Sequence, residues 1–86
     1  MAGHVIRDND LTWREIDEEV IVLDLVSSKY LSLNGTGALL WKRLATGAED
    51  DQLVDLLTER FGIAREVAET DVAAFLDHCT ALGLVR

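Results

Sequence analysis

Proline is absent from this chain of 86 residues, and cysteine occurs once, at Cys79. A lone cysteine cannot form an intrachain disulfide, so the chain shows no sign of a secreted disulfide scaffold and fits a reducing cytoplasm. Apolar runs such as Val20–Leu23 are far too short to span a bilayer, and residues 1–10 are polar, unlike a signal peptide. The sequence therefore predicts a cytoplasmic protein with no membrane segment. We expect one domain over residues 1–86, with residues 1–10 as a flexible arm.

Positive charge is also scarce. Eight Lys and Arg residues stand against 16 Asp and Glu residues, which gives a formal net charge of −8 at pH 7. A surface of this sign repels polyanions, so nucleic acid and acidic membranes are poor partners.

Groups that could do chemistry are few and scattered. His4 and His78 lie far apart, and there is no Cys-x-x-Cys or His-x-x-x-His spacing, which disfavours a metal site. Cys79 falls on the apolar stripe of a predicted helix, where a free thiol behaves as a small hydrophobe. We therefore expect no catalytic residues, no metal and no cofactor, and a chain that is not an enzyme.

Three segments rich in β-branched and aromatic residues predict strands over 12–16, 20–25 and 29–33. The connections between them are too short for a parallel crossover, so an antiparallel meander is expected. Beyond the third strand the apolar spacing becomes helical. The pattern predicts an α+β fold, in which a three-stranded antiparallel sheet is followed by three helices.

The three expected helices have recognisable ends. Asn34 or Thr36 can cap the first helix, and Gly47 ends it. The second helix stops at Gly62, and the third spans about 65–82.

The third strand offers a candidate binding edge. It carries one charge, Lys29, and no proline, so it could accept a peptide as an additional strand. The alternative, that a helix or the first ten residues cover this edge, stays open.

One flank of the third helix could form the other wall of a groove. Val67, Asp71, Ala74 and His78 share this flank by their spacing, and Phe75 borders it. An ordinary boundary face between core and solvent is the alternative. On the stripe beside this flank, core positions are expected at Val72, Leu76 and Leu82.

The residues of the third strand also resemble a known family. The run Lys29-Tyr30-Leu31-Ser32-Leu33-Asn34, followed by Gly37 and Leu40-Trp41, resembles the strand-Leu-Asn-x-x-Gly-x-x-x-Trp pattern of PqqD-like proteins. The segment Asp71-Val72-x-x-Phe75-Leu76 and the closing Leu82-Gly83-Leu84-Val85 are similar to that family as well. The resemblance covers about residues 11–86.

This resemblance implies a winged-helix-like RiPP recognition element, where RiPP means a ribosomally made, post-translationally modified peptide. Such domains bind the leader of a precursor peptide beside their third strand and against their third helix. Stand-alone copies with a tryptophan in the first helix look most like the recognition protein of lasso peptide biosynthesis, which delivers the precursor to a separate leader peptidase and a cyclase. Carried over by position, the peptide-binding residues are Ser28, Lys29, Tyr30, Leu31, Ser32, Leu33, Val67, Asp71, Ala74, Phe75 and His78.

Two other functions stay open. The chain could be a PqqD-type peptide chaperone for a radical enzyme of cofactor biosynthesis. It could also be a winged-helix DNA-binding protein, but residues 65–82 contain one arginine, no lysine and four carboxylates, which oppose phosphate contacts.

Overall fold

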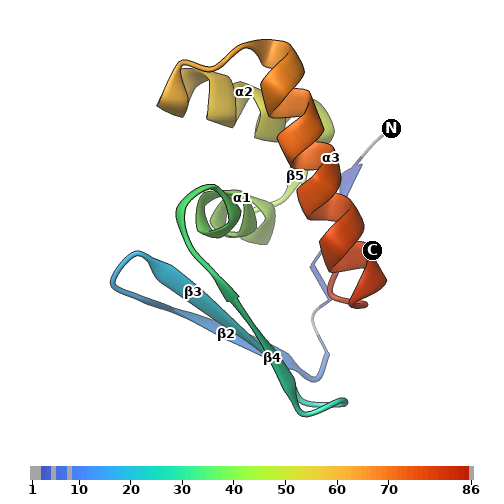
Figure 1. Cartoon of the computed structure of the whole chain (residues 1–86). Coiled ribbons are helices and arrows are strands. Elements are labelled where there is room, and N and C mark those ends of the chain that lie inside the picture. Colours follow the sequence, from blue (N-terminus) through green and yellow to red (C-terminus); the bar gives the residue numbers. More distant parts are fainter. Residues whose placement is uncertain (1–2, 5, 8, 86) are drawn as a thin grey trace.

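In the computed structural model, which describes residues 3, 4, 6, 7 and 9–85, a three-stranded antiparallel sheet is followed by three helices (Figure 1). The α+β class expected from the sequence is confirmed. In chain order the elements are β1 (Gly3–His4), β2 (Leu11–Ile16), β3 (Glu19–Asp24), β4 (Lys29–Leu33), α1 (Gly35–Ala45), β5 (Ala48–Glu49), α2 (Asp50–Phe61) and α3 (Arg65–Ala81).

The three-stranded sheet has the order β2-β3-β4, as the short connections predict. A two-residue turn joins β2 to β3, with Ile16 opposite Glu19, and Asp17 in this turn has a φ of +58°. Positive φ suits the tight turns whose twist matches that of a hairpin. The second hairpin places Lys29 opposite Asp24, and Ser28 before it has a φ of +61°.

Alternate residues of the sheet face the helices. Val20 and Val22 of β3 are buried, and helix α1 crosses above this face, with α2 on its far side (Figure 1). Trp41 of α1 is fully buried and makes an edge-to-face contact with Trp13 of β2, with the ring centroids 6.3 Å apart and the planes at 81°. Such an edge-to-face contact is favourable beyond the area that it buries. The sheet and α1 are therefore fixed to each other at the centre of the core.

Gly37 lies where β4, α1 and α3 approach one another. A Cβ placed on Gly37 would lie 3.2 Å from Leu33 Cδ2 and 3.9 Å from Phe75 Cε1. A side chain here would push against the end of β4, so glycine permits the close approach of β4, α1 and α3.

The helix ends agree in part with the sequence analysis. Gly62 adopts a left-handed conformation with φ of +63°, and its N–H donates to Thr58 O over 3.0 Å, as expected for the end of α2. Asn34 is the N-cap of α1, but its side chain makes no capping hydrogen bond. The first turn of α1 therefore lacks the side-chain cap that the sequence predicts.

The core assignment on α3 is right for two positions and wrong for the third. Val72 and Leu76 are buried, but Leu82 is 45% exposed. Because α3 ends at Ala81 and Leu82 is its C-cap, Leu82 leaves the helical stripe. Gly83 then reverses the chain with a φ of +74°, and Leu84 is buried in place of Leu82.

The start of the chain pairs with two distant segments, which the sequence analysis missed. Gly3 and His4 pair with Glu49 and Ala48, and Ile6 forms an isolated bridge with Val85. Two-residue strands carry no periodic signal, so sequence patterns do not reveal them. The flexibility expected for residues 1–10 stays a prediction.

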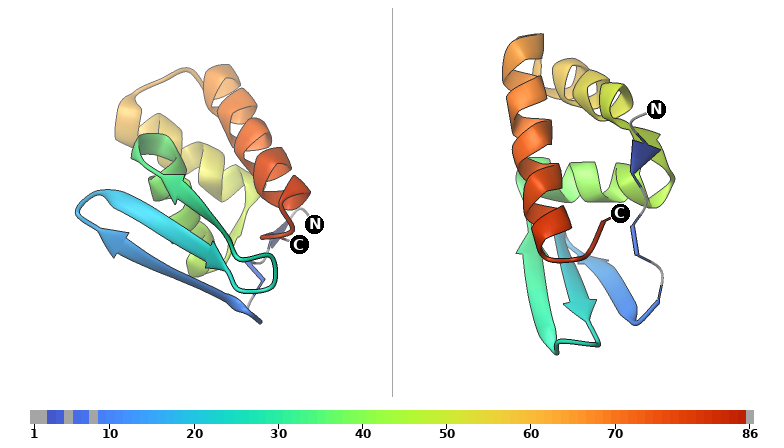
Figure 2. Two further views of the ribbon diagram at one scale, coloured as in Figure 1. Left: turned by 60° about the horizontal axis from the view of Figure 1, so that its bottom comes forward. Right: turned by 90° about the vertical axis from the view of Figure 1, so that its right-hand side faces the viewer.

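Helix α3 reaches its C-terminal end beside the start of β4 (Figure 2). None of the helices in the described part of the chain is sufficiently long and apolar to cross a membrane.

Candidate functional site

Strand β4 lies at an edge of the sheet. It pairs with β3 on one side, and no other strand among the described residues pairs with its second side. Such an edge exposes backbone donors and acceptors that a further strand can use.

The register identifies the residues of β4 whose backbone faces outward. In antiparallel sheets, residues alternate between those that exchange hydrogen bonds with one neighbour and those that point to the other side. The N–H of Leu25 donates to Asp10 O over 2.9 Å. Every second residue of β3 from there, beginning with Leu23, therefore directs its backbone N–H and C=O groups toward β2. Val22 and Asp24 therefore turn their backbone groups toward β4.

Their partners in β4 are Leu31 and Lys29, respectively. These two residues use their backbone groups for pairing with β3. By the same alternation, the N–H and C=O groups of Tyr30 and Ser32 point away from the sheet and are available to an added strand.

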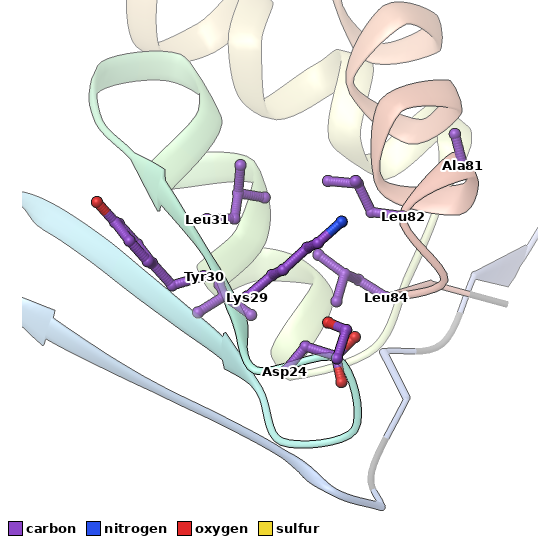
Figure 3. Close-up of a pocket in the computed structure, with 9 residues that line it drawn as sticks. Asp24, Lys29, Tyr30, Leu31, Ala81, Leu82 and Leu84 are labelled. Carbon is purple, nitrogen blue, oxygen red and sulfur yellow. The ribbon is translucent and has the colours of Figure 1, made fainter.

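Side chains along β4 alternate between the two faces of the sheet. Leu33 is buried on the helix side, and Leu31 and Lys29 follow it on that side at intervals of two. Tyr30 projects to the other face of the sheet and is 73% exposed (Figure 3). The residues whose backbone can bind a strand are thus different from those whose side chains face α3.

A cavity of about 300 Å³ opens between the start of β4 and the end of α3 (Figure 3). Most of its wall is apolar, and the side chain of Lys29 extends across it toward Leu82. The residues that line the cavity are Val22, Asp24, Ser27, Lys29, Tyr30, Leu31, Ala81, Leu82 and Leu84.

The predicted residues of β4 and of α3 have different relations to this cavity. Of the six predicted in and beside β4, only Lys29, Tyr30 and Leu31 line it. Phe75 is half-buried near Gly37 and Leu33, beyond the far end of the cavity. The other predicted positions on α3, which are Val67, Asp71, Ala74 and His78, are exposed and do not line the cavity.

The helix wall nevertheless continues along one flank. Asp71, Phe75 and His78 follow one another at intervals of four and three residues, so they share one side of the helix, and Leu82 follows at its end. The cavity lies at the C-terminal end of this flank. Residues 67–78 would extend the groove beyond the cavity, toward the other end of α3.

Six residues of the cavity were missed by the sequence analysis: Val22, Asp24, Ser27, Ala81, Leu82 and Leu84. One signal in the sequence could have indicated Leu82. It directly precedes the helix-ending Gly83, so it need not follow the buried stripe.

Arg7 and Asp24 form an ion pair at the base of the cavity. Arg7 Nη2 lies 2.7 Å from Asp24 Oδ1, and both side chains are largely buried, being 16% and 14% exposed. Arg7 also donates to Gly83 O over 3.2 Å and to Asp10 O over 3.2 Å. The hydrogen bond from Arg7, with a further one from the N–H of Val26, lowers the pKa of the Asp24 carboxyl to about 2.

The cysteine is placed as the sequence analysis expects. Cys79 is buried on α3, and this burial raises the pKa of its thiol to about 11. The thiol is therefore protonated at neutral pH and is a poor nucleophile. The described residues include no group of three or more His, Cys, Asp or Glu side chains that could hold a metal ion.

Comparisons with known proteins give a matching family model and two similar solved structures. Residues 19–85 match the family model of coenzyme PQQ synthesis protein D (PqqD). The structure of TbiB1 in complex with the TbiA(beta) leader peptide is similar with a TM-score of 0.89 and 26% identity, over 95% of this chain and 94% of that one. Lasso peptide synthetase B1 complexed with the leader peptide is similar with a TM-score of 0.86 and 28% identity, over 96% of each chain. None of the curated proteins matches the chain significantly.

Proposed function

The chain belongs to the PqqD family, and from this membership we propose that it binds the leader segment of a ribosomally made precursor peptide in lasso peptide biosynthesis. The leader is added as a strand beside β4 and packs against α3. The observation that carries the proposal is the free edge of β4 beside an apolar cavity, in a fold shared with two proteins solved with leader peptides.

The two parts of the groove do different work in binding. The outward backbone groups of Tyr30 and Ser32 supply hydrogen bonds that any extended peptide can use, and these provide affinity with little selectivity. Selectivity comes from the cavity, which receives side chains of the leader. Its volume of about 300 Å³ is at the lower end of the range of about 300–1,000 Å³ that ligand pockets have, so it suits a short part of a peptide.

The contacting residues are proposed to comprise the predicted groove and the end of α3. The predicted set is Ser28, Lys29, Tyr30, Leu31, Ser32, Leu33, Val67, Asp71, Ala74, Phe75 and His78. To these the cavity adds Ala81, Leu82 and Leu84.

The chain acts on the peptide by holding it. We propose that it delivers the leader to a separate leader peptidase and then to a cyclase, and that it leaves the peptide chemically unchanged itself. Holding substrate and enzyme together raises the effective concentration of one near the other, so processing accelerates without a catalytic group in this chain.

A PqqD-type role beside a radical enzyme is the second candidate, and the description of the matching family model favours it. The two solved structures favour the lasso pathway, because one is named as a lasso peptide synthetase and spans nearly the whole chain. The precursor peptide distinguishes the two candidate functions, because a lasso precursor carries a leader segment that a peptidase removes. A DNA-binding role is disfavoured, since Arg65, the single basic residue of α3 apart from His78, is engaged by Asp55 at 2.8 Å.

Isothermal titration tests the proposal. The ligand is the leader segment of a precursor peptide encoded beside the gene for this chain, with a scrambled peptide of the same composition as control. We expect saturable binding of the leader alone, an unchanged peptide mass after incubation with this chain, and faster cleavage when the neighbouring peptidase is added together with it. No binding of the leader, or cleavage by this chain alone, would refute the proposal.

A further inference from the structure

The cavity contains one cation that has no anionic partner in the described part of the chain. Lys29 lies on the helix-facing side of β4, and its ammonium group extends toward Leu82 in the middle of an otherwise largely apolar wall (Figure 3). It takes part in none of the ion pairs among the described residues, although the chain has twice as many acidic as basic residues.

The carboxylate that should neutralise Lys29 is already occupied. Asp24 is directly opposite Lys29 in the register of β3 and β4, and oppositely charged residues in this relation ordinarily pair. Asp24 Oδ1 instead accepts hydrogen bonds from Arg7 Nη2 at 2.7 Å and from the N–H of Val26 at 3.0 Å. Arg7 thereby holds Asp24 at the base of the cavity and leaves the ammonium group of Lys29 free.

This arrangement gives the cavity a specific chemical preference. The wall beside Lys29 consists of Leu31, Leu82 and Leu84, which suit an aliphatic or aromatic side chain. A carboxylate next to that side chain would meet Lys29, the only unpaired cation among the described residues that line the cavity, in a place where the peptide itself excludes part of the water.

We propose that Lys29 selects peptides carrying a carboxylate next to an apolar side chain, and that Arg7 is a positioning residue which keeps Lys29 available by binding Asp24. The inference rests on the proposed function, since it assigns the chemistry that the same groove recognises. It concerns selectivity among peptides, whereas the added strand beside β4 concerns binding as such.

The test measures a preference between matched peptides. The probes are the leader used above and variants in which each Asp or Glu is changed singly to Asn or Gln, together with a C-terminally amidated form. Neutralising one acidic residue of the leader should weaken its binding to the wild-type chain about fivefold. This factor corresponds to an ion-pair energy near the upper end of the range measured at exposed sites. Amidation distinguishes a side-chain carboxylate from the terminal one.

Variants of the chain then assign the preference to Lys29. Lys29→Met keeps most of the apolar stem and should bind acidic and neutralised leaders equally, and Lys29→Glu should prefer the neutralised leader. Arg7→Met should reduce the preference although Lys29 is intact, because Asp24 is released to pair with it. Adding Asp24→Asn to Arg7→Met should restore the preference, which a merely structural role of Arg7 would not produce.

The outcomes separate the two proposals. The leader could bind although neutralising its acidic residues changes the affinity of wild type and of the Lys29 variants alike. That result would overturn this inference and leave the proposed function in place. A leader that does not bind wild-type chain at all would overturn both. If Arg7→Met lowered affinity for all peptides equally and the double variant restored no preference, the positioning role of Arg7 would be wrong.

Discussion

Leu82 provides the sharpest test of where the groove lies, because it was expected in the core and is found at the cavity. Complete burial of a leucine side chain contributes about 1.5–3 kcal/mol. Since 45% of Leu82 remains exposed, a peptide that covered it fully would gain about 0.7–1.3 kcal/mol from this contact. Leu82→Ala should therefore weaken leader binding about three- to ninefold.

Leu76→Ala is the matched control, since it is the same substitution on the same helix at a buried position. Leu76 is 5% exposed, so its truncation leaves a hole in the core and should lower the free energy of unfolding by about 2–5 kcal/mol. Leu82→Ala should cost clearly less, because the side chain is only partly surrounded in the unbound chain.

The assay combines titration calorimetry of the leader with urea unfolding of both variants. Two results would refute the reasoning. A folded Leu82→Ala variant that bound the leader like wild type would exclude the C-terminal end of α3 from the groove. Equal losses of unfolding free energy for the two variants would show that Leu82 belongs to the core after all.

Three further predictions concern the edge strand, the helix wall and the base of the cavity. Tyr30→Pro removes an outward N–H and should weaken leader binding several-fold, whereas Leu31→Pro removes an amide that faces β3 and should lower the melting temperature instead. Titration measures the first effect and circular dichroism the second. Normal binding by a folded Tyr30→Pro chain would argue against an added strand. Ala74→Glu places a carboxylate on an exposed position of α3 and should reduce affinity at least about tenfold with little change in melting temperature, because the peptide would bury this charge; unchanged affinity would exclude the flank over 67–78. The pKa of Asp24 is lowered from 3.8 to about 2, so its carboxylate contributes stability that is present above about pH 4 and is lost as the pH falls through about 2. Asp24→Asn should therefore melt below wild type at pH 7, and a difference that did not shrink between pH 4 and pH 2 would contradict this assignment.

The sequence was sufficient for the three strands of the larger sheet, the three helices and their order, because the period of the apolar residues differs between strand and helix. The two-residue strands β1 and β5 give no such signal. Positions 29–33 are predicted as a strand with the bounds that β4 has, and α3 ends one residue before the predicted limit. Short connections sufficed to make β4 an edge, since three antiparallel strands joined by tight turns leave the first and third outermost.

Tertiary structure alone decided what surrounds that edge. The sequence does not reveal which amides of β4 point outward, because this depends on the register with β3, which the turn between β3 and β4 fixes. It placed Leu82 on the buried stripe by helical spacing, but the helix stops before this residue, and Leu84 takes the buried position.

The contact of Arg7 with Asp24 shows the same limit most clearly. Seventeen residues separate the two side chains, and no spacing rule relates them. Only the return of the chain end, where the N–H of Arg7 donates to Leu84 O over 2.8 Å, brings Arg7 to the base of the cavity. Local periodicity therefore determined the three longer strands, the three helices and their order, whereas long-range pairing determined which groups the groove presents to a ligand.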